Sequence, residues 1–133
     1  MKKLALALAS AAALAVLGLT ACSGGSSADS DSVPQDPATA ILGVWGEPDS
    51  QGKPSLEFAE DGSFAGTDGC NRLFGTWTVD GERVDLGAMG STMMYCEGVD
   101  DWLNRAVAVT VRGDALVVSD EGGAEIGTLD RQR

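Results

Sequence analysis

Cys70 and Cys96 are the residues of this sequence whose chemistry is easiest to define. As a disulfide they would close a loop of about 27 residues, which the chain-entropy model credits with roughly 3 to 4 kcal/mol of stabilisation. As thiols they would form a redox pair or a nucleophile. The sequence has no CxxC motif and no histidine that could lower a thiol pKa. A structural disulfide is therefore the favoured interpretation, and thiol chemistry is the alternative.

Asn71 and Arg72 follow the first of these cysteines and form a second candidate site. The forked guanidinium of Arg72 suits an anionic ligand. In the alternative interpretation the two residues form a turn, since asparagine tolerates a left-handed backbone and hydrogen-bonds locally. The turn is favoured, and Asn71 and Arg72 stay a candidate ligand-binding pair.

The acidic residues supply carboxylates without a recognisable site. Their spacing fits neither an EF-hand nor another metal-ligand pattern; the residues considered are Asp68, Asp85, Glu97, Asp100 and Asp101. Histidine, the commonest general base and a usual zinc ligand, is absent, as are G-x-S-x-G and P-loop motifs. We predict no metal, no cofactor and no catalytic residue, and hence a protein that is not an enzyme.

The N-terminal segment predicts export. Lys2 and Lys3 precede the apolar run Leu4–Leu19, and Leu19-Thr20-Ala21-Cys22 resembles the lipobox of bacterial lipoprotein precursors. That resemblance implies a signal peptide over residues 1–21, cleavage before Cys22 and a diacyl anchor of the palmitate type on Cys22. A short apolar helix followed by a free cysteine is the alternative. We expect a lipid-anchored protein on the extracytoplasmic face of a cell membrane, where two remaining cysteines can stay oxidised.

Composition separates the exported chain into two parts. Residues 22–39 are rich in Ser, Gly, Asp and Pro without apolar periodicity, so they predict a flexible acidic tether, and residues 40–133 predict one domain. The 133-residue chain has 9 basic and 20 acidic residues, and removal of Lys2 and Lys3 changes its net charge from −11 to −13. This charge repels nucleic acid, which we exclude as a partner.

The domain sequence predicts short antiparallel strands. Asp61-Gly62 and Asp80-Gly81 each predict a hairpin between β-prone runs, and Gly113-Asp114 predicts a third. Apolar residues recur at helical spacing within residues 97–106, so we expect one short helix there. About eight strands and one helix predict a mainly β (α+β) fold, either a small curved sheet or a barrel. The aromatic residues expected in its core are Trp45, Phe58, Phe64, Phe74, Trp77 and Trp102.

Several motifs resemble the META domain family, which includes HslJ-type lipoproteins. They are Gly43-Val44-Trp45, the hairpin Phe58–Phe64, Asp68-Gly69-Cys70-Asn71-Arg72 with Gly75-Thr76-Trp77, and Ser91–Cys96. Their order and spacing extend the resemblance from about Leu42 to Leu129, with departures at Tyr95 and Gly98. The resemblance implies a small β-rich domain with a helix, a link to stress response and envelope integrity, and no established catalytic residues.

Three functions are compatible with these features. We favour a non-catalytic envelope module that binds another envelope protein or a small molecule, and an exposed apolar patch or a formed pocket would support it. A purely structural or stress-protective lipoprotein would show a featureless acidic surface. A hydrolase would need two carboxylates facing one cleft.

Overall fold

The computed structural model describes residues 35–133, so the predicted signal peptide, the lipidation site Cys22 and most of the predicted tether lie outside the described residues. The described chain begins with the one-turn helix α1 (Pro37–Ala40). Asp36 caps it by accepting a hydrogen bond from the Ala38 amide at 3.3 Å, and Pro37 suits the first helical position because its missing N–H is not needed there. None of the helices in residues 35–133 is long and apolar enough to span a membrane.

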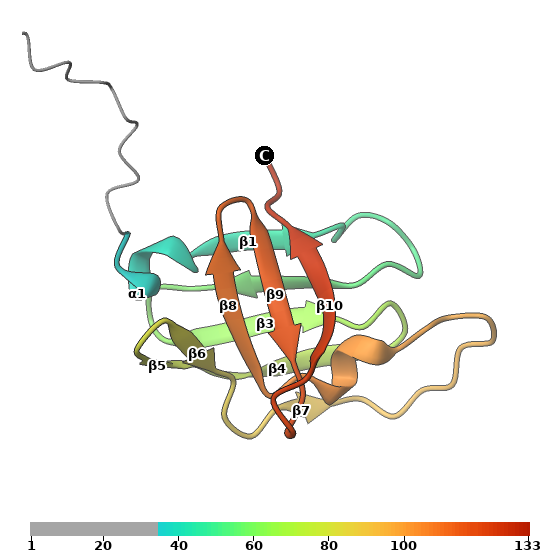
Figure 1. Cartoon of the computed structure of the whole chain (residues 1–133). Coiled ribbons are helices and arrows are strands. Elements are labelled where there is room, and N and C mark those ends of the chain that lie inside the picture. Colours follow the sequence, from blue (N-terminus) through green and yellow to red (C-terminus); the bar gives the residue numbers. More distant parts are fainter. Residues whose placement is uncertain (1–34) are drawn as a thin grey trace, which may run out of the picture. The chain divides into compact units, whose positions relative to one another are not determined.

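Ten strands of the described chain form two antiparallel sheets of five strands each (Figure 1). Sheet A contains, in spatial order, β1 (Gly43–Gly46), β2 (Ser55–Phe58), β3 (Ser63–Thr67), β4 (Arg72–Thr76) and β7 (Gly90–Ser91). Sheet B contains, in spatial order, β10 (Glu125–Asp130), β9 (Ala115–Ser119), β8 (Ala108–Arg112), β6 (Arg83–Asp85) and β5 (Thr78–Asp80). The predicted mainly β antiparallel fold is therefore confirmed, and its sheets stay open instead of closing into one barrel.

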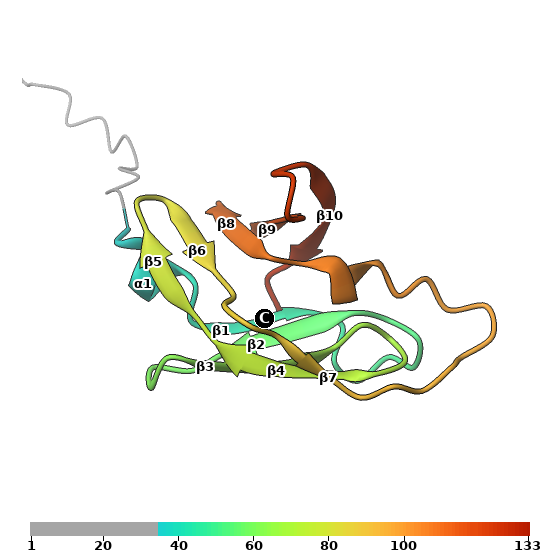
Figure 2. The same ribbon diagram turned by 90° about the horizontal axis from the view of Figure 1, so that it is seen from below.

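The hydrophobic core lies between the two sheets, which stack face to face (Figure 2). Alternation along each strand sends every second side chain into this space. Sheet A contributes Leu56, Phe58, Phe64 and Leu73, sheet B contributes Val84, Val109, Leu116, Val118 and Leu129, and the connecting segments contribute Ile41, Leu86 and Leu103. Trp45 is fully buried among them.

The prediction of six core aromatics is wrong for Phe74. Trp45, Phe58 and Phe64 are buried, and Trp77 and Trp102 pack against the core while half-buried, but Phe74 is 54% exposed. Leu73 takes the inward position of β4, so its neighbour Phe74 must face outward. Trp77 lies between β4 and β5, four residues after Leu73, so the alternation that places Leu73 inward also places Trp77 against the core, whereas Phe74 has the opposite orientation.

The predicted helix over residues 97–106 is much shorter in the structure. Only Trp102–Arg105 is helical, as the 3₁₀ turn η1. Gly98 has a φ of +77°, a backbone conformation that no α-helix accepts. The helical spacing of the sequence therefore reflects a single turn, which places Leu103 in the core.

Candidate functional site

The loop between β3 and β4 contains the predicted Asn71 and Arg72, and Asp68 organises it. The Asp68 side chain is fully buried, and its Oδ1 accepts hydrogen bonds from the amides of Cys70 at 2.8 Å and Asn71 at 2.6 Å. Gly69 has a φ of +99°, and a Cβ there would lie 2.7 Å from the Gly52 carbonyl oxygen. This turn therefore requires both the carboxylate and the glycine.

Cys70 and Cys96 form a disulfide in the structure, as the sequence predicts. The bond ties the β3–β4 loop to the segment that follows β7, across a sequence separation of 26 residues. Both residues are half-buried, at the edge of sheet A. The cross-link therefore joins two segments whose backbone pairing is short, since β7 has only two residues.

Asn71 holds the same two segments together by hydrogen bonds. Its Nδ2 donates to the Met94 carbonyl at 3.0 Å, and its Oδ1 accepts from the Met94 amide at 2.5 Å and from the Thr92 hydroxyl at 2.9 Å. The side chain is buried and its bonding capacity is largely used. Asn71 therefore has a structural role in the described chain, which is the turn interpretation of the sequence analysis.

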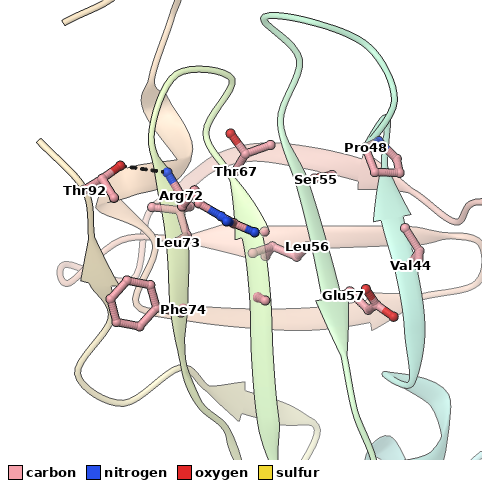
Figure 3. A pocket seen from close by; sticks show the side chains of 12 residues that line it. Val44, Pro48, Ser55, Leu56, Glu57, Thr67, Arg72, Leu73, Phe74 and Thr92 are labelled. Atoms are coloured by element: carbon pink, nitrogen blue, oxygen red, sulfur yellow. Dashed lines mark hydrogen bonds between the residues drawn. The ribbon is translucent and has the colours of Figure 1, made fainter. Parts of the chain in front are cut away.

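Arg72, in contrast, is exposed on the outer face of sheet A. Its side chain extends from β4 across β3 (Figure 3) and makes no ion pair among residues 35–133. The register of the strands places Arg72 opposite Thr67, with Ser55 opposite Thr67 on the next strand. The structure therefore separates the predicted pair, since Asn71 supports the loop while Arg72 offers a free guanidinium.

A second row of outward side chains lies beside Arg72. It runs across all five strands of sheet A and consists of Val44, Glu57, Ala65, Phe74 and Gly90. A Cβ at position 90 would lie 2.3 Å from the Phe74 ring, so glycine there lets the ring lie flat against the edge strand.

The two rows border an open groove of about 640 Å³ on this face (Figure 3). Small residues of β3, including Ala65 and Thr67, form its floor, and Arg72 is its only basic lining residue. Its size is within the usual range for small-molecule sites. The groove thus combines a cation, an exposed aromatic ring and hydroxyl groups.

The described residues show no arrangement that suggests metal or acid–base chemistry. No group of three or more Cys, Asp or Glu side chains in residues 35–133 is placed to hold a metal ion. Among the acids considered from sequence, Asp68 is used by the turn and Asp85 pairs with Arg83 at 2.8 Å. One carboxylate, that of Glu57, lines the groove.

Sequence reasoning missed two exposed features, one on the outer face of sheet A and one in the loop after β7. Phe74 was assigned to the core, and the exposure of Met93, Met94 and Tyr95 was not anticipated. The available signal was the position of these three residues, between a glycine-containing segment and the second cysteine, without the alternation that would bury a strand.

Comparisons with known proteins give two partial structural likenesses and a family. No curated protein matches the chain. A solved structure of a DUF4847 family protein from Bacteroides vulgatus is 21% identical, with a TM-score of 0.41, over 60% of this chain and 61% of that one. A protein from Burkholderia xenovorans, solved by NMR, is 18% identical, with a TM-score of 0.46, over 73% of this chain and 88% of that one.

The chain thus spans about three fifths of the length of the Bacteroides protein that it resembles. The sequence model of the META domain matches residues 39–133 of this chain. That range contains both cysteine motifs and every strand of the two sheets. The chain therefore belongs to the META domain family.

Proposed function

We propose that this protein is a non-catalytic binding module, anchored through Cys22 on the extracytoplasmic face of a membrane. Its ligand lies in the groove on the outer face of sheet A and presents an anionic group to Arg72. The observation that carries this proposal is Arg72, which makes no ion pair among residues 35–133, on the same face of β4 as the exposed ring of Phe74, in a domain that is otherwise strongly acidic.

The acidic charge of the domain and the position of Arg72 in the groove together favour an anionic group at this arginine. Residues 40–133 contain seven basic residues against 17 acidic ones. An anion is repelled by most of such a surface, so it gains binding energy only where a guanidinium is free and can donate two hydrogen bonds. Phe74 adds apolar contact for a part of the ligand without charge.

The alternatives of the sequence analysis fit this surface less well. A purely structural or stress-protective lipoprotein predicts a featureless acidic surface, whereas sheet A has a groove with a free cation and an exposed aromatic ring. A hydrolase with paired carboxylates needs a second acid facing Glu57, and the groove lining contains one carboxylate. We therefore retain the binding module, with the envelope and stress association of the family as its proposed setting.

The test compares N-acetylphenylalanine with its C-terminal amide as ligands, because the pair differs only in the carboxylate. NMR chemical shifts of the mature protein are followed during titration. We expect the carboxylate to perturb Thr67, Arg72 and Phe74, and Arg72→Gln to weaken its binding about tenfold, a change of roughly 1.4 kcal/mol.

Arg112→Gln is the matched control, because Arg112 is also exposed and has no ion pair among residues 35–133, but lies on sheet B. Equal binding of the acid and the amide, or an unchanged affinity in Arg72→Gln, would remove the basis of the proposal. The same holds if neither compound perturbs the groove.

A further inference from the structure

The loop between β7 and η1 carries three consecutive exposed side chains, which we call the apolar tip: Met93, Met94 and Tyr95. Their exposed fractions are 94%, 61% and 89%. In residues 35–133 the other large hydrophobic side chains that are exposed, Phe74 and Val79, are not part of such a run. Methionine and tyrosine are enriched in protein interfaces, and a cluster of exposed apolar residues marks an interaction site more often than scattered ones do.

The base of the apolar tip is fixed on both sides. Cys96, directly after the tip, forms a disulfide with Cys70. The Asn71 side chain forms hydrogen bonds with both the amide and the carbonyl of Met94. Before the tip, the Thr92 hydroxyl accepts a hydrogen bond from the Arg72 amide at 3.0 Å. Because the Met94 backbone is already held in place, the tip loses little backbone conformational entropy when it binds a partner.

Acidic residues border the apolar tip. Glu97, Asp100 and Asp101 follow it and are exposed, whereas Arg105 is the only basic residue between positions 91 and 107. None of these three carboxylates forms an ion pair within residues 35–133. The apolar tip is thus followed directly in the chain by an anionic segment, its acidic border, and such charges beside an apolar contact favour a partner with complementary basic residues.

We propose that the apolar tip docks into an apolar pocket on another protein, and that lysine or arginine side chains border this pocket. The acidic border disfavours insertion into a membrane with anionic headgroups, which would repel it. It also disfavours tip-to-tip contact with a second copy of this chain, because two anionic borders would then face each other. None of the three tip residues lines the groove, although Thr92 directly before them does, and the proposal does not depend on the ligand of Arg72.

The test is photo-crosslinking in cells, with p-benzoylphenylalanine in place of Tyr95 in the full-length protein and, as the control, in place of the exposed Glu121. We expect a protein adduct from position 95 and none of the same mass from position 121. Mass spectrometry of the adduct should place the crosslink among apolar residues with lysine or arginine beside them. In the same background, Met93→Ser and the double variant Glu97→Lys with Asp101→Lys should each reduce the adduct at least fivefold.

Two comparisons separate docking from changes in folding or abundance. Thermal unfolding and membrane levels of each variant should match the parent, and Glu121→Lys should leave the adduct unchanged. The proposal would be overturned by a lipid adduct, by an adduct with a second copy of this chain, or by the absence of any adduct. It would also be overturned by a crosslink site without basic residues, or by an adduct that persists after the charge reversal at Glu97 and Asp101.

Discussion

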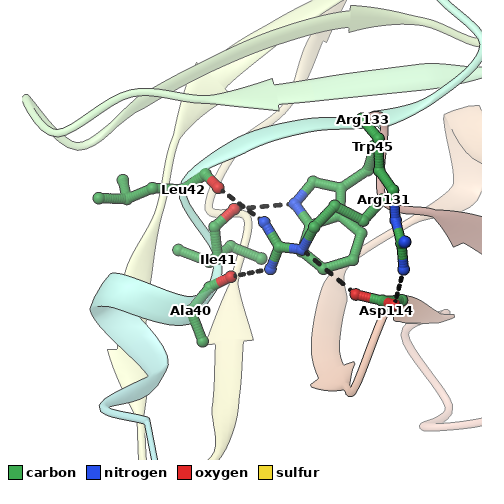
Figure 4. Close-up of polar contacts among 7 residues, drawn as sticks. All are labelled: Ala40, Ile41, Leu42, Trp45, Asp114, Arg131 and Arg133. Atoms are coloured by element: carbon green, nitrogen blue, oxygen red, sulfur yellow. Dashed lines mark hydrogen bonds and ion pairs between the residues drawn. The ribbon is translucent and has the colours of Figure 1, made fainter.

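Arg131 lies over the indole ring of Trp45, with its guanidinium carbon 4.0 Å from the ring centroid (Figure 4). The same guanidinium donates hydrogen bonds to the carbonyls of Ala40 at 2.6 Å and Leu42 at 3.2 Å. The Trp45 indole N–H donates to the Ile41 carbonyl at 2.8 Å. One arginine near the C-terminus thus holds the segment that leads into β1, where sheets A and B meet.

Arg131→Met should destabilise the domain by about 2 to 3 kcal/mol, because it removes the cation–π contact and leaves two carbonyls without their donor. Urea denaturation followed by tryptophan fluorescence measures this loss. Arg112→Met is the control, since Arg112 is exposed and should change the free energy of unfolding by less than about 0.5 kcal/mol. Equal effects of the two substitutions would show that the Arg131 contacts contribute nothing specific.

The disulfide should contribute a larger amount. For a closed loop of about 27 residues, the chain-entropy model predicts that Cys70→Ala with Cys96→Ala lowers the free energy of unfolding by roughly 3 to 4 kcal/mol. Urea denaturation of the oxidised protein, the reduced protein and the double variant measures it. The reduced protein and the variant should agree closely, and a wild-type protein insensitive to reductant would contradict a structural role.

Asn71→Ala should also be strongly destabilising, because the buried Asn71 makes three hydrogen bonds to Thr92 and Met94. We expect a loss of about 2 to 3 kcal/mol, and faster amide exchange at Met94. Asn104→Ala is the matched control: Asn104 is exposed, its one side-chain bond is to Asp101, and its removal should change the free energy of unfolding by less than about 0.5 kcal/mol. A mild effect at Asn71 would mean that the disulfide alone positions the loop.

Local signals predicted the hairpins well. Asp61-Gly62 joins β2 to β3, Asp80-Gly81 joins β5 to β6, and Gly113-Asp114 joins β8 to β9. These turns need few residues and a glycine that adopts positive φ, so four residues of sequence are enough to specify each one. The pairing of Cys70 with Cys96 was also predictable, because they are the two cysteines that remain besides Cys22 and an oxidising compartment keeps such a pair bonded.

The features that depend on distant residues were not predictable. The division into two sheets rests on pairings such as β6 with β8, whose residues are about 25 positions apart. Phe74 faces outward because its neighbour Leu73 takes the inward position of β4, and which of these two adjacent apolar residues faces inward depends on the sheet that packs against them. The different roles of Asn71 and Arg72 likewise depend on a distant residue, because Asn71 is held by hydrogen bonds to Met94, which lies 23 residues away in the sequence.

A final prediction concerns the Asp61 carboxylate in the turn between β2 and β3. The Ser63 hydroxyl donates to it at 2.5 Å and the Ser63 amide donates at 2.8 Å, and these hydrogen bonds lower the pKa of Asp61 below its ordinary value. A group whose pKa is lower in the folded than in the unfolded state stabilises the fold above its unfolded pKa of about 3.9. That contribution is lost as the pH falls through the folded pKa.

NMR titration of the Asp61 carboxyl carbon should therefore give a midpoint below that of an unstructured aspartate. Ser63→Ala removes the hydroxyl donor and should move the midpoint upward, while the amide hydrogen bond keeps part of the shift. The free energy of unfolding should decline with acidification less steeply in Ser63→Ala than in the wild type. An ordinary midpoint in the wild-type protein would show that Ser63 does not hold the carboxylate in solution, and the turn would then owe its geometry to Gly62, whose φ is +84°.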